Sequence, residues 1–315
     1  MPERIPVLYV AGSSRSGSTL VANAIATTPG VVSVGEVRHI WTRGIGENWR
    51  CGCGSAFEQC EFWNEVLSEA FGRPPRIDID RLRSSERQLL RLRTSWRALD
   101  WTRNPARIQS RHGHYLEALE RLYPAIASVA DAEAIVDSSK TPTYAAVLSL
   151  LHHLDLRVLH LTRDPRAAAY SFLNPKPSPD RGPSESMDRL GTSKSSFLWA
   201  WWNGLADRLW QGRPNVLMAR IRYEALTREP EETLRYLRAV LLPEVSDRIW
   251  GVAGRTVNLG VSHTVSGNPD RLKEGPVVIE PDDRWQAGLS ARQQALVVAI
   301  AGRMMHRYGY GPEPG

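Results

Sequence analysis

The chain has 315 residues, of which 42% are hydrophobic and 23% are charged, so it can bury a core and has an ordinary globular composition. No apolar run approaches the roughly 20 residues of a membrane span, and the run at 5–11 is too short for a signal-peptide core. We therefore expect one domain, residues 1–315, in the cytoplasm. The net charge of +6 comes mainly from arginine, and the absence of a basic stripe interleaved with aromatics argues against a nucleic acid partner.

Short apolar runs that alternate with helical patterns predict a parallel sheet. The predicted strands are 5–11, 31–34, 134–136, 157–161 and 215–220, and the clearest predicted helices are 19–27 and 290–308. This alternation is typical of a doubly wound α/β fold. We expect a P-loop-like, three-layer fold in which helices flank a central parallel sheet; the sequence leaves the oligomeric state open.

Three segments interrupt this pattern. Residues 63–130 predict a mostly helical, arginine-rich insertion, which we expect to form a cap over the carboxyl edge of the sheet. Residues 174–196 are rich in proline, serine and glycine, which indicates a mobile loop or lid. Residues 257–283 have similar loop chemistry.

A glycine-rich segment follows the first predicted strand. Residues 12–20 read Gly-Ser-Ser-Arg-Ser-Gly-Ser-Thr-Leu, which matches the glycine spacing of a P-loop but places Ser18 where that motif requires lysine. Small residues let backbone N–H groups point inward, and the N-terminus of the following helix adds partial positive charge. The segment therefore predicts an anion site, the alternative being a simple strand-to-helix turn.

This segment resembles the 5′-phosphosulfate loop of sulfotransferases that use 3′-phosphoadenosine 5′-phosphosulfate (PAPS). Arginine at position 15 is typical of many bacterial members and of the tyrosylprotein sulfotransferases. The resemblance implies that Arg15 contacts the bridging oxygen and the sulfuryl group. It also implies that the 5′-phosphate is held by Ser16, Gly17, Ser18 and Thr19.

Later motifs extend the resemblance. Residues 159–171 place Arg163 at a strand end and Ser171 on the next helix, where family members grip the 3′-phosphate; a structural salt bridge is the alternative for the arginine. Residues 222–226, Arg-Tyr-Glu-Ala-Leu, imply that Tyr223 lies beside the nucleotide, unless it is a core tyrosine. Residues 262–271 resemble a late loop that closes on PAPS, which implies contacts from Ser266 and Arg271.

Two further strand ends carry candidate catalytic residues. Glu36 follows the second predicted strand and Lys140 the third, at the edge where such sheets bind ligands. By the resemblance, Glu36 takes the acceptor proton, while Lys140 and Arg15 stabilise charge on the transferring group. The alternatives are a solvated loop glutamate and a solvated surface lysine.

The three cysteines are clustered at Cys51, Cys53 and Cys60. An odd count of closely spaced cysteines argues against a disulfide framework. Three ligands without a C-x2-C pair do not make a standard zinc site. The segment, Cys-Gly-Cys-Gly followed by Cys-Glu-Phe-Trp, resembles one in bacterial sulfotransferases, and we interpret it as a structural knuckle that shapes the acceptor entrance; a metal site is the alternative.

Together these features predict in-line transfer of a sulfuryl group from PAPS to a hydroxyl, with no metal required. The sequence leaves the acceptor open, since a small molecule, a glycolipid, a carbohydrate or a peptide each offers a hydroxyl; we expect the insertion at 63–130 to govern the choice. One alternative is a P-loop kinase or nucleotidase, which requires lysine at position 18 and a magnesium-binding carboxylate such as Asp137. The other is a non-catalytic nucleotide-sensing module.

Overall fold

The central feature of the computed structural model is a five-stranded sheet. The structure describes residues 4–178, 180, 182, 184–213, 216–248 and 250–311. The strands are arranged in the order β2-β3-β1-β4-β5 and every neighbouring pair is parallel. Their bounds are β1 Ile5–Gly12, β2 Val31–Gly35, β3 Ala134–Lys140, β4 Leu154–Thr162 and β5 Met218–Arg222. The predicted α/β fold with a parallel sheet is confirmed; the predicted start of the last strand, residue 215, lies outside the described residues.

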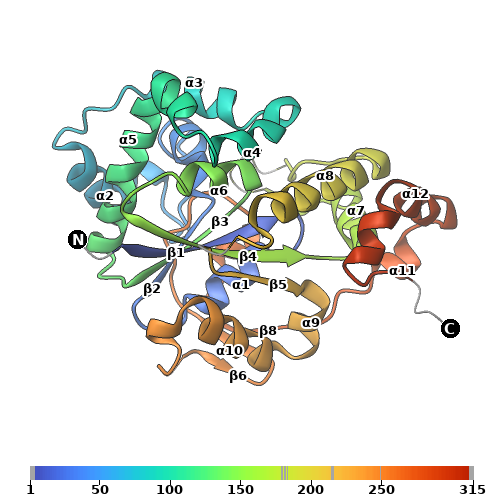
Figure 1. Ribbon diagram of the computed structural model, residues 1–315. Helices are drawn as coiled ribbons and strands as arrows, with labels where there is room; N and C mark the ends of the chain where they lie inside the picture. The colour runs from blue at the N-terminus through green and yellow to red at the C-terminus, as the bar shows by residue number, and fades with distance from the viewer. Residues whose placement is uncertain are drawn as a thin grey trace.

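Helices cover both faces of this sheet (Figure 1). Alternate residues of β1 point to opposite faces, as the period of a strand requires, so that Val7 and Tyr9 join one core cluster while Leu8 and Val10 join another. The Leu8 face is covered by α1 and α10, and the Tyr9 face by α5, α6 and α8. The bounds of these helices are α1 Ser18–Ile25, α5 Ala106–Val129, α6 Pro142–Leu148, α8 Thr192–Trp210 and α10 Pro230–Leu241.

The remaining elements lie around this framework. Near the carboxyl end of β4, α12 packs against α7 and α8, and its capping box at Ser290 agrees with the predicted start of the last helix. Within the described ranges, no helix has both the length and the apolar content to cross a bilayer. The bounds are α7 Pro165–Leu173, α9 Tyr223–Arg228, α11 Trp285–Gly288 and α12 Ala291–Arg307, with single 3-10 turns at Val37–His39, Phe57–Gln59, Pro243–Val245 and Pro269–Leu272 and a π-turn at Ile40–Gly44.

The insertion is helical as predicted, but it is part of a helical layer. Its elements are α2 Glu61–Phe71, α3 Ile79–Leu89, a 3-10 turn at Leu92–Arg97, α4 Ala98–Trp101 and α5. The apolar face of α5, including Leu119 and Ile126, shares one core cluster with Val7 and Tyr9 of β1. The α5 part of the insertion therefore covers a face of the sheet, because its apolar side needs an apolar partner. The cap over the carboxyl edge stays a prediction.

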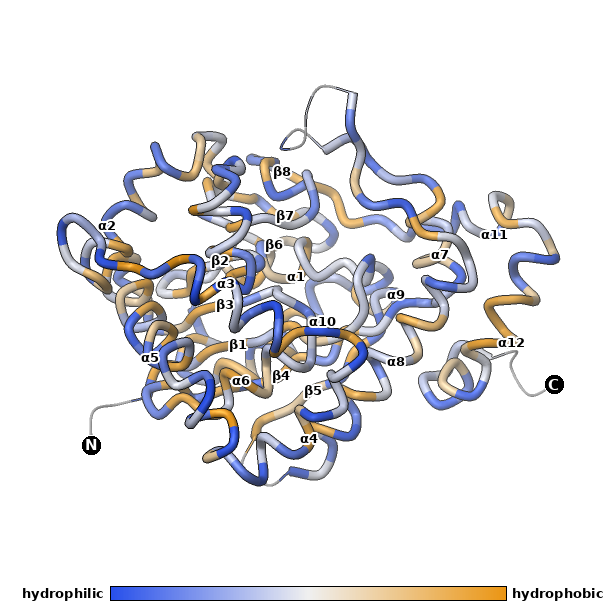
Figure 2. Tube along the Cα trace, turned by 90° about the horizontal axis from the view of Figure 1, so that it is seen from above, coloured by the Kyte–Doolittle hydropathy of each residue, from blue (hydrophilic) through white to orange (hydrophobic). Residues whose placement is uncertain are grey.

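The late segment predicted as a loop contains secondary structure. Strands β6 (Val252–Ala253), β7 (Thr256–Leu259) and β8 (Gly275–Val278) form a small antiparallel sheet that shares a core cluster with α1. Figure 2 shows these three strands next to one another. Between β7 and β8, Val265 lies beside β2: its N–H donates to the carbonyl of Val34 at 2.9 Å, and its carbonyl accepts from the N–H of Glu36 at 2.8 Å. Strands this short carry too few residues for a recognisable alternation.

The predicted lid at 174–196 is only partly described. Residues 179, 181 and 183 lie outside the described part of the chain, and α8 already begins at Thr192. An isolated bridge pairs Pro177 with Ser186.

The buried position of β1 yields a stability prediction. Leu8 is fully buried in the core, whereas Leu296 of α12 is 39% exposed. We expect Leu8→Ala to lower the free energy of unfolding by about 2–5 kcal/mol, because it leaves a cavity. The matched Leu296→Ala change should cost about 1 kcal/mol or less. Urea unfolding followed by circular dichroism measures both, and equal losses in the two variants would contradict the described core.

Candidate active site

A cavity of about 570 Å³ lies at the carboxyl ends of the parallel strands. Its floor is made by the segments that follow β1, β2, β3 and β4, and its walls by parts of 171–188 and 259–284. This is the edge at which doubly wound sheets bind ligands. Basic side chains outnumber acidic ones among the described residues that line it, so the cavity favours an anionic ligand.

The loop between β1 and α1 has an unusual backbone. Arg15 and Gly17 have φ values of 68° and 89°, in the left-handed region that L side chains rarely adopt. A Cβ atom on Gly17 would lie 2.4 Å from the ring of Tyr223, so only glycine allows this loop to pass so close to the tyrosine. The loop leads directly into the N-terminus of α1, where backbone N–H groups and the helix dipole favour an anion.

Arg15, within this loop, and Arg163 connect the loop with neighbouring segments. The Arg15 guanidinium donates to the Sδ of Met187 at 2.9 Å and to the carbonyl of Asp188 at 3.3 Å. Arg163, directly after β4, donates to the carbonyl of Arg15 at 3.1 Å and lies 4.5 Å above the ring of Tyr223. The contacts connect the ends of β1 and β4 with the wall of the cavity.

Arg163 also forms an ion pair across the cavity. Its Nη2 lies 2.8 Å from the Oδ2 of Asp282, while its buried Nε has no hydrogen-bond partner. The guanidinium of Arg284 and then the charge of Arg163 hold the pKa of Asp282 well below its ordinary value, so the aspartate is ionised. The carboxylate of Asp282 therefore contacts Arg163 at the cavity. An anionic ligand could form the same kind of contact with this guanidinium.

Glu36 and Lys140 meet at the neighbouring strand ends. Lys140 donates from Nζ to the Oε1 of Glu36, and the Oε2 of the same carboxylate lies 3.7 Å from the Nε2 of His39. Glu36 is only 8% exposed. The left-handed backbone at Lys140, with a φ of 68°, occurs where β3 ends.

The electrostatics keep Glu36 ionised. Burial would raise the pKa of its carboxyl, but the ammonium of Lys140 and the guanidinium of Arg38 outweigh burial and hold that pKa below its ordinary value. Burial lowers the pKa of Lys140, in spite of the opposing effect of Glu36. Burial and the nearby cations also hold the pKa of His39 well below its ordinary value, so the imidazole is neutral at pH 7.

Most of the residues that the sequence singled out line this one cavity. They are Arg15, Gly17, Ser18, Thr19, Glu36, Lys140, Arg163, Ser171 and Tyr223. The structure thus brings together the phosphate loop, the acid–base candidates and the strand-end arginine, although they are far apart in the sequence.

Three predicted site residues do not line the cavity. The side chain of Ser16 is buried, and the hydroxyl of Ser266 accepts a hydrogen bond from Arg43 at 2.8 Å. Arg271 is 1% exposed, and its guanidinium donates to Asp180 at 2.8 Å and to the carbonyl of Arg50 at 3.0 Å. The Nε and Nη1 of Arg271 are buried without a hydrogen-bond partner. Contacts of Ser266 and Arg271 with a cofactor stay predictions.

The sequence reasoning missed several lining residues. Arg38 and Arg43 follow Glu36 closely and lie at the cavity, and their position beside a candidate base could have drawn attention to them. Asp282, which pairs with Arg163, carries no such signal, since only the return of the late segment brings it there.

Asp137 is unsuited to binding magnesium in this cavity. Its side chain is fully buried, and its oxygens accept from Tyr123 Oη at 2.5 Å and from the backbone N–H of Ser139 at 2.8 Å. Burial raises the pKa of this carboxyl to about 6. Because Asp137 does not line the cavity, the carboxylate that a kinase would need is directed elsewhere.

Comparisons with known protein structures agree with the α/β fold described above. The chain aligns over 96% of its length with the sulfotransferase domain from the Synechococcus PCC 7002 olefin synthase, with a TM-score of 0.51, 19% identity and 96% coverage of that chain. It aligns equally far with the sulfotransferase domain from the curacin biosynthetic pathway, with a TM-score of 0.50, 16% identity and 98% coverage of that chain. At these identities the matches show a shared fold. A comparison with curated protein sequences gave no match.

A sequence model of the sulfotransferase family matches residues 6–246, which include the phosphate loop, both strand-end residues of the ion pair and Arg163. Since this match covers well over half of the chain, the protein belongs to the sulfotransferase family.

Proposed function

We propose that this protein transfers a sulfuryl group from PAPS to the hydroxyl of an acceptor in a single in-line displacement. The bond between sulfur and the 5′-phosphate oxygen breaks, a bond between sulfur and the acceptor oxygen forms, and 3′-phosphoadenosine 5′-phosphate leaves. The observation that carries the proposal is the convergence of an anion-binding loop and the Glu36–Lys140 pair on one cavity.

The residues present suit a donor with two separate phosphate groups. The Gly17 loop and the N-terminus of α1 offer backbone N–H groups to one group, and Arg163 with Ser171 offers charged and neutral donors to the other. A 3′-phosphate would take the place of the Asp282 carboxylate on Arg163. PAPS supplies the activated sulfuryl group; the chain supplies binding and charge.

Glu36 is the proposed proton acceptor. Its lowered pKa means that the carboxylate is ionised at neutral pH and can receive the acceptor proton as the new sulfur–oxygen bond forms. Lys140 and Arg15 line the same cavity as Glu36. They would stabilise the negative charge that develops on the leaving phosphate oxygen as the sulfur–oxygen bond breaks. We expect no metal in this reaction step.

The acceptor would enter along the walls of the cavity. Described residues of the 63–130 insertion are not among those that line it, whereas Trp49, Phe172 and Met187 are. We therefore assign acceptor choice to segments 36–49 and 171–188 rather than to the insertion. A small molecule, a glycolipid, a carbohydrate or a peptide each offers the required hydroxyl.

The donor assignment is tested by calorimetry on the wild-type chain. We expect 3′-phosphoadenosine 5′-phosphate to bind at least tenfold more tightly than ATP with magnesium, because the loop lacks the P-loop lysine and Asp137 is turned away from the cavity. Tighter binding of ATP with magnesium would overturn the donor assignment and favour a kinase.

Replacing the proposed base isolates the chemical step. Glu36→Gln should lower kcat by about 10²–10⁴-fold, since general base catalysis is lost, while affinity for 3′-phosphoadenosine 5′-phosphate changes little. The measurement is release of that product from PAPS with an acceptor found by screening phenols, sugars and alcohols. Glu69→Gln, at an exposed residue of α2 outside the cavity lining, is the matched control. Undiminished turnover in Glu36→Gln would exclude this residue as the base.

Replacing Arg163 separates the two phosphate sites. Arg163→Ala should weaken binding of 3′-phosphoadenosine 5′-phosphate about tenfold or more, because hydrogen bonds between charged groups contribute about 1.5–3 kcal/mol. It should change the affinity for adenosine 5′-phosphate much less, since that ligand has no 3′-phosphate. Titration calorimetry compares both ligands, with Arg107→Ala on an exposed side chain as the control. Equal losses for the two ligands would contradict a 3′-phosphate contact.

A further inference from the structure

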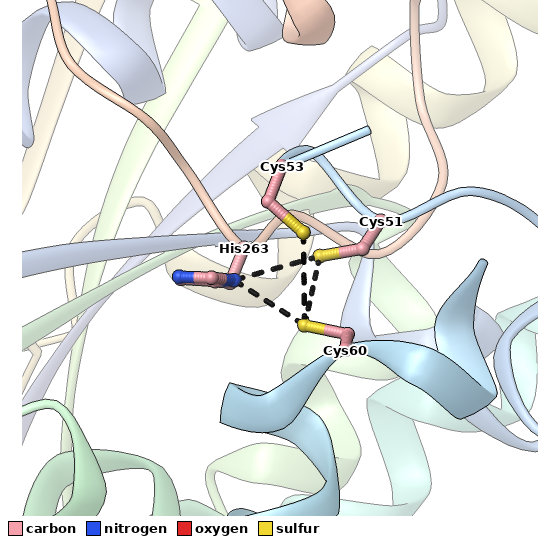
Figure 3. A group of neighbouring side chains, drawn as sticks. All are labelled: Cys51, Cys53, Cys60 and His263. Atoms are coloured by element: carbon pink, nitrogen blue, oxygen red, sulfur yellow. Dashed lines mark hydrogen bonds between the residues drawn. The ribbon is translucent and has the colours of Figure 1, made fainter. Parts of the chain in front are cut away.

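The cysteine segment acquires a fourth neighbour in the folded chain. The Sγ atoms of Cys51, Cys53 and Cys60 and a ring nitrogen of His263 all lie within 4.8 Å of one another (Figure 3). Cys51 and Cys53 lie in the turn before α2, and Cys60 directly precedes that helix. His263 follows β7 and lies 203 residues after Cys60 in the sequence. The four side chains converge on one point in Figure 3.

Four of the six distances between these donor atoms are close to those around a tetrahedral metal ion, and all six are within 4.8 Å. The Sγ of Cys60 lies 3.5 Å from that of Cys51 and 3.8 Å from that of Cys53. The Nδ1 of His263 lies 3.3 Å and 3.8 Å from the sulfurs of Cys60 and Cys51. A tetrahedral zinc ion with Zn–S bonds of about 2.3 Å and a Zn–N bond of about 2.0 Å separates its ligands by about 3.8 Å between sulfurs and about 3.6 Å between sulfur and nitrogen.

The chemistry of the four donors selects zinc. Thiolates and imidazole are soft or borderline ligands, and a set of three cysteines and one histidine in a tetrahedron is typical of structural zinc. The same sulfurs are too far apart for a disulfide, whose bond length is about 2.05 Å. Cys51 is 0% and Cys60 2% exposed, whereas Cys53 and His263 are partly exposed, so the cluster lies at the edge of the core.

The position of the cluster indicates a structural role. None of the four ligands lines the described cavity, and four protein ligands leave no open coordination position for a substrate. The segments that carry them are already in contact: the N–H of Gly52 donates to the carbonyl of Thr264 at 3.0 Å, and the indole N–H of Trp63 donates to the carbonyl of His263 at 2.8 Å. The ring of Phe62 stacks on the imidazole at 4.7 Å.

The cluster adjoins the proposed active site through the backbone. Two residues after His263, Val265 forms bridges with both Cys51 and Gly35, and its carbonyl accepts from the N–H of Glu36. Gly267, two residues after Val265, lines the cavity. A metal at the cluster would hold residues 263–267 against the end of β2. The position of Glu36 depends on this contact, because its N–H donates to the carbonyl of Val265.

We propose that Cys51, Cys53, Cys60 and His263 bind one zinc ion that fastens the late segment 263–267 to the strand end that carries Glu36. The interpretation as a structural knuckle counted three ligands along the sequence, whereas the fold supplies His263 as the fourth. This inference does not rest on the proposed reaction, and the measurements below do not require activity.

Metal analysis of the untagged, reduced chain tests the site. After incubation with zinc chloride and gel filtration, mass spectrometry should find about one zinc per wild-type chain. The Cys53→Ser and His263→Asn variants should hold less than about 0.2 zinc per chain, and His306→Asn, at an exposed histidine, should keep the wild-type content. A wild-type chain below about 0.2 zinc, or equal zinc in all variants, would overturn the proposal.

If the variants fail to fold, a second measurement on the wild-type chain alone still tests the site. Stepwise modification of its thiols with p-mercuribenzoate should release zinc in proportion to the sulfurs modified, as a metal-sensitive dye reports. Removal of zinc by 1,10-phenanthroline should lower Tm by about 5 °C or more, because binding energy at such a site is folding energy. Zinc, but not magnesium, should restore it. Zinc that stays bound after all thiols are modified, or an unchanged Tm, would contradict the assignment.

Discussion

The proposed chemistry depends on the buried ion pair between Glu36 and Lys140. Each residue ends one of two adjacent parallel strands, and the register of β2 and β3 brings these ends together. Burying a single charge is costly, and the mutual attraction of a well-placed pair offsets much of that cost. Loss of either partner would therefore leave an uncompensated charge beside the cavity. The pair also explains why a glutamate surrounded by protein stays ionised and able to accept a proton.

A second requirement is the coverage of the sheet edge by the late part of the chain. The parallel strands alone would present an open rim of side chains. Val265 pairs with the end of β2, and Asp282 reaches Arg163 from the segment after β8. These contacts turn the rim into a walled cavity, where electrostatic interactions with an anionic ligand are stronger than in open water. The proposed donor site and the position of the proposed base thus depend on the same late segment.

The sequence predicted more of the floor of the site than of its walls. Glycine spacing located the phosphate loop, and short apolar runs located the strand ends that carry Glu36, Lys140 and Arg163, because these signals lie within a few residues. The insertion was predicted to be helical for the same local reason. Its position against a face of the sheet was not predicted, because periodicity shows that a helix has an apolar face but not which surface that face covers. The ion pair of Arg271 with Asp180 was not predicted either, because these residues lie far apart in the sequence.

The sequence by itself determined the parallel α/β architecture, the family to which the chain belongs and the residues at the floor of the cavity. All three are encoded in local patterns of apolar residues, glycine and charge. Only the tertiary structure decided that Asp282 contacts Arg163, that the insertion forms a helical layer, and that His263 joins Cys51, Cys53 and Cys60. The physical reason is distance along the chain: partners that lie far apart in the sequence leave no local pattern, and only the packing of the whole domain brings them together.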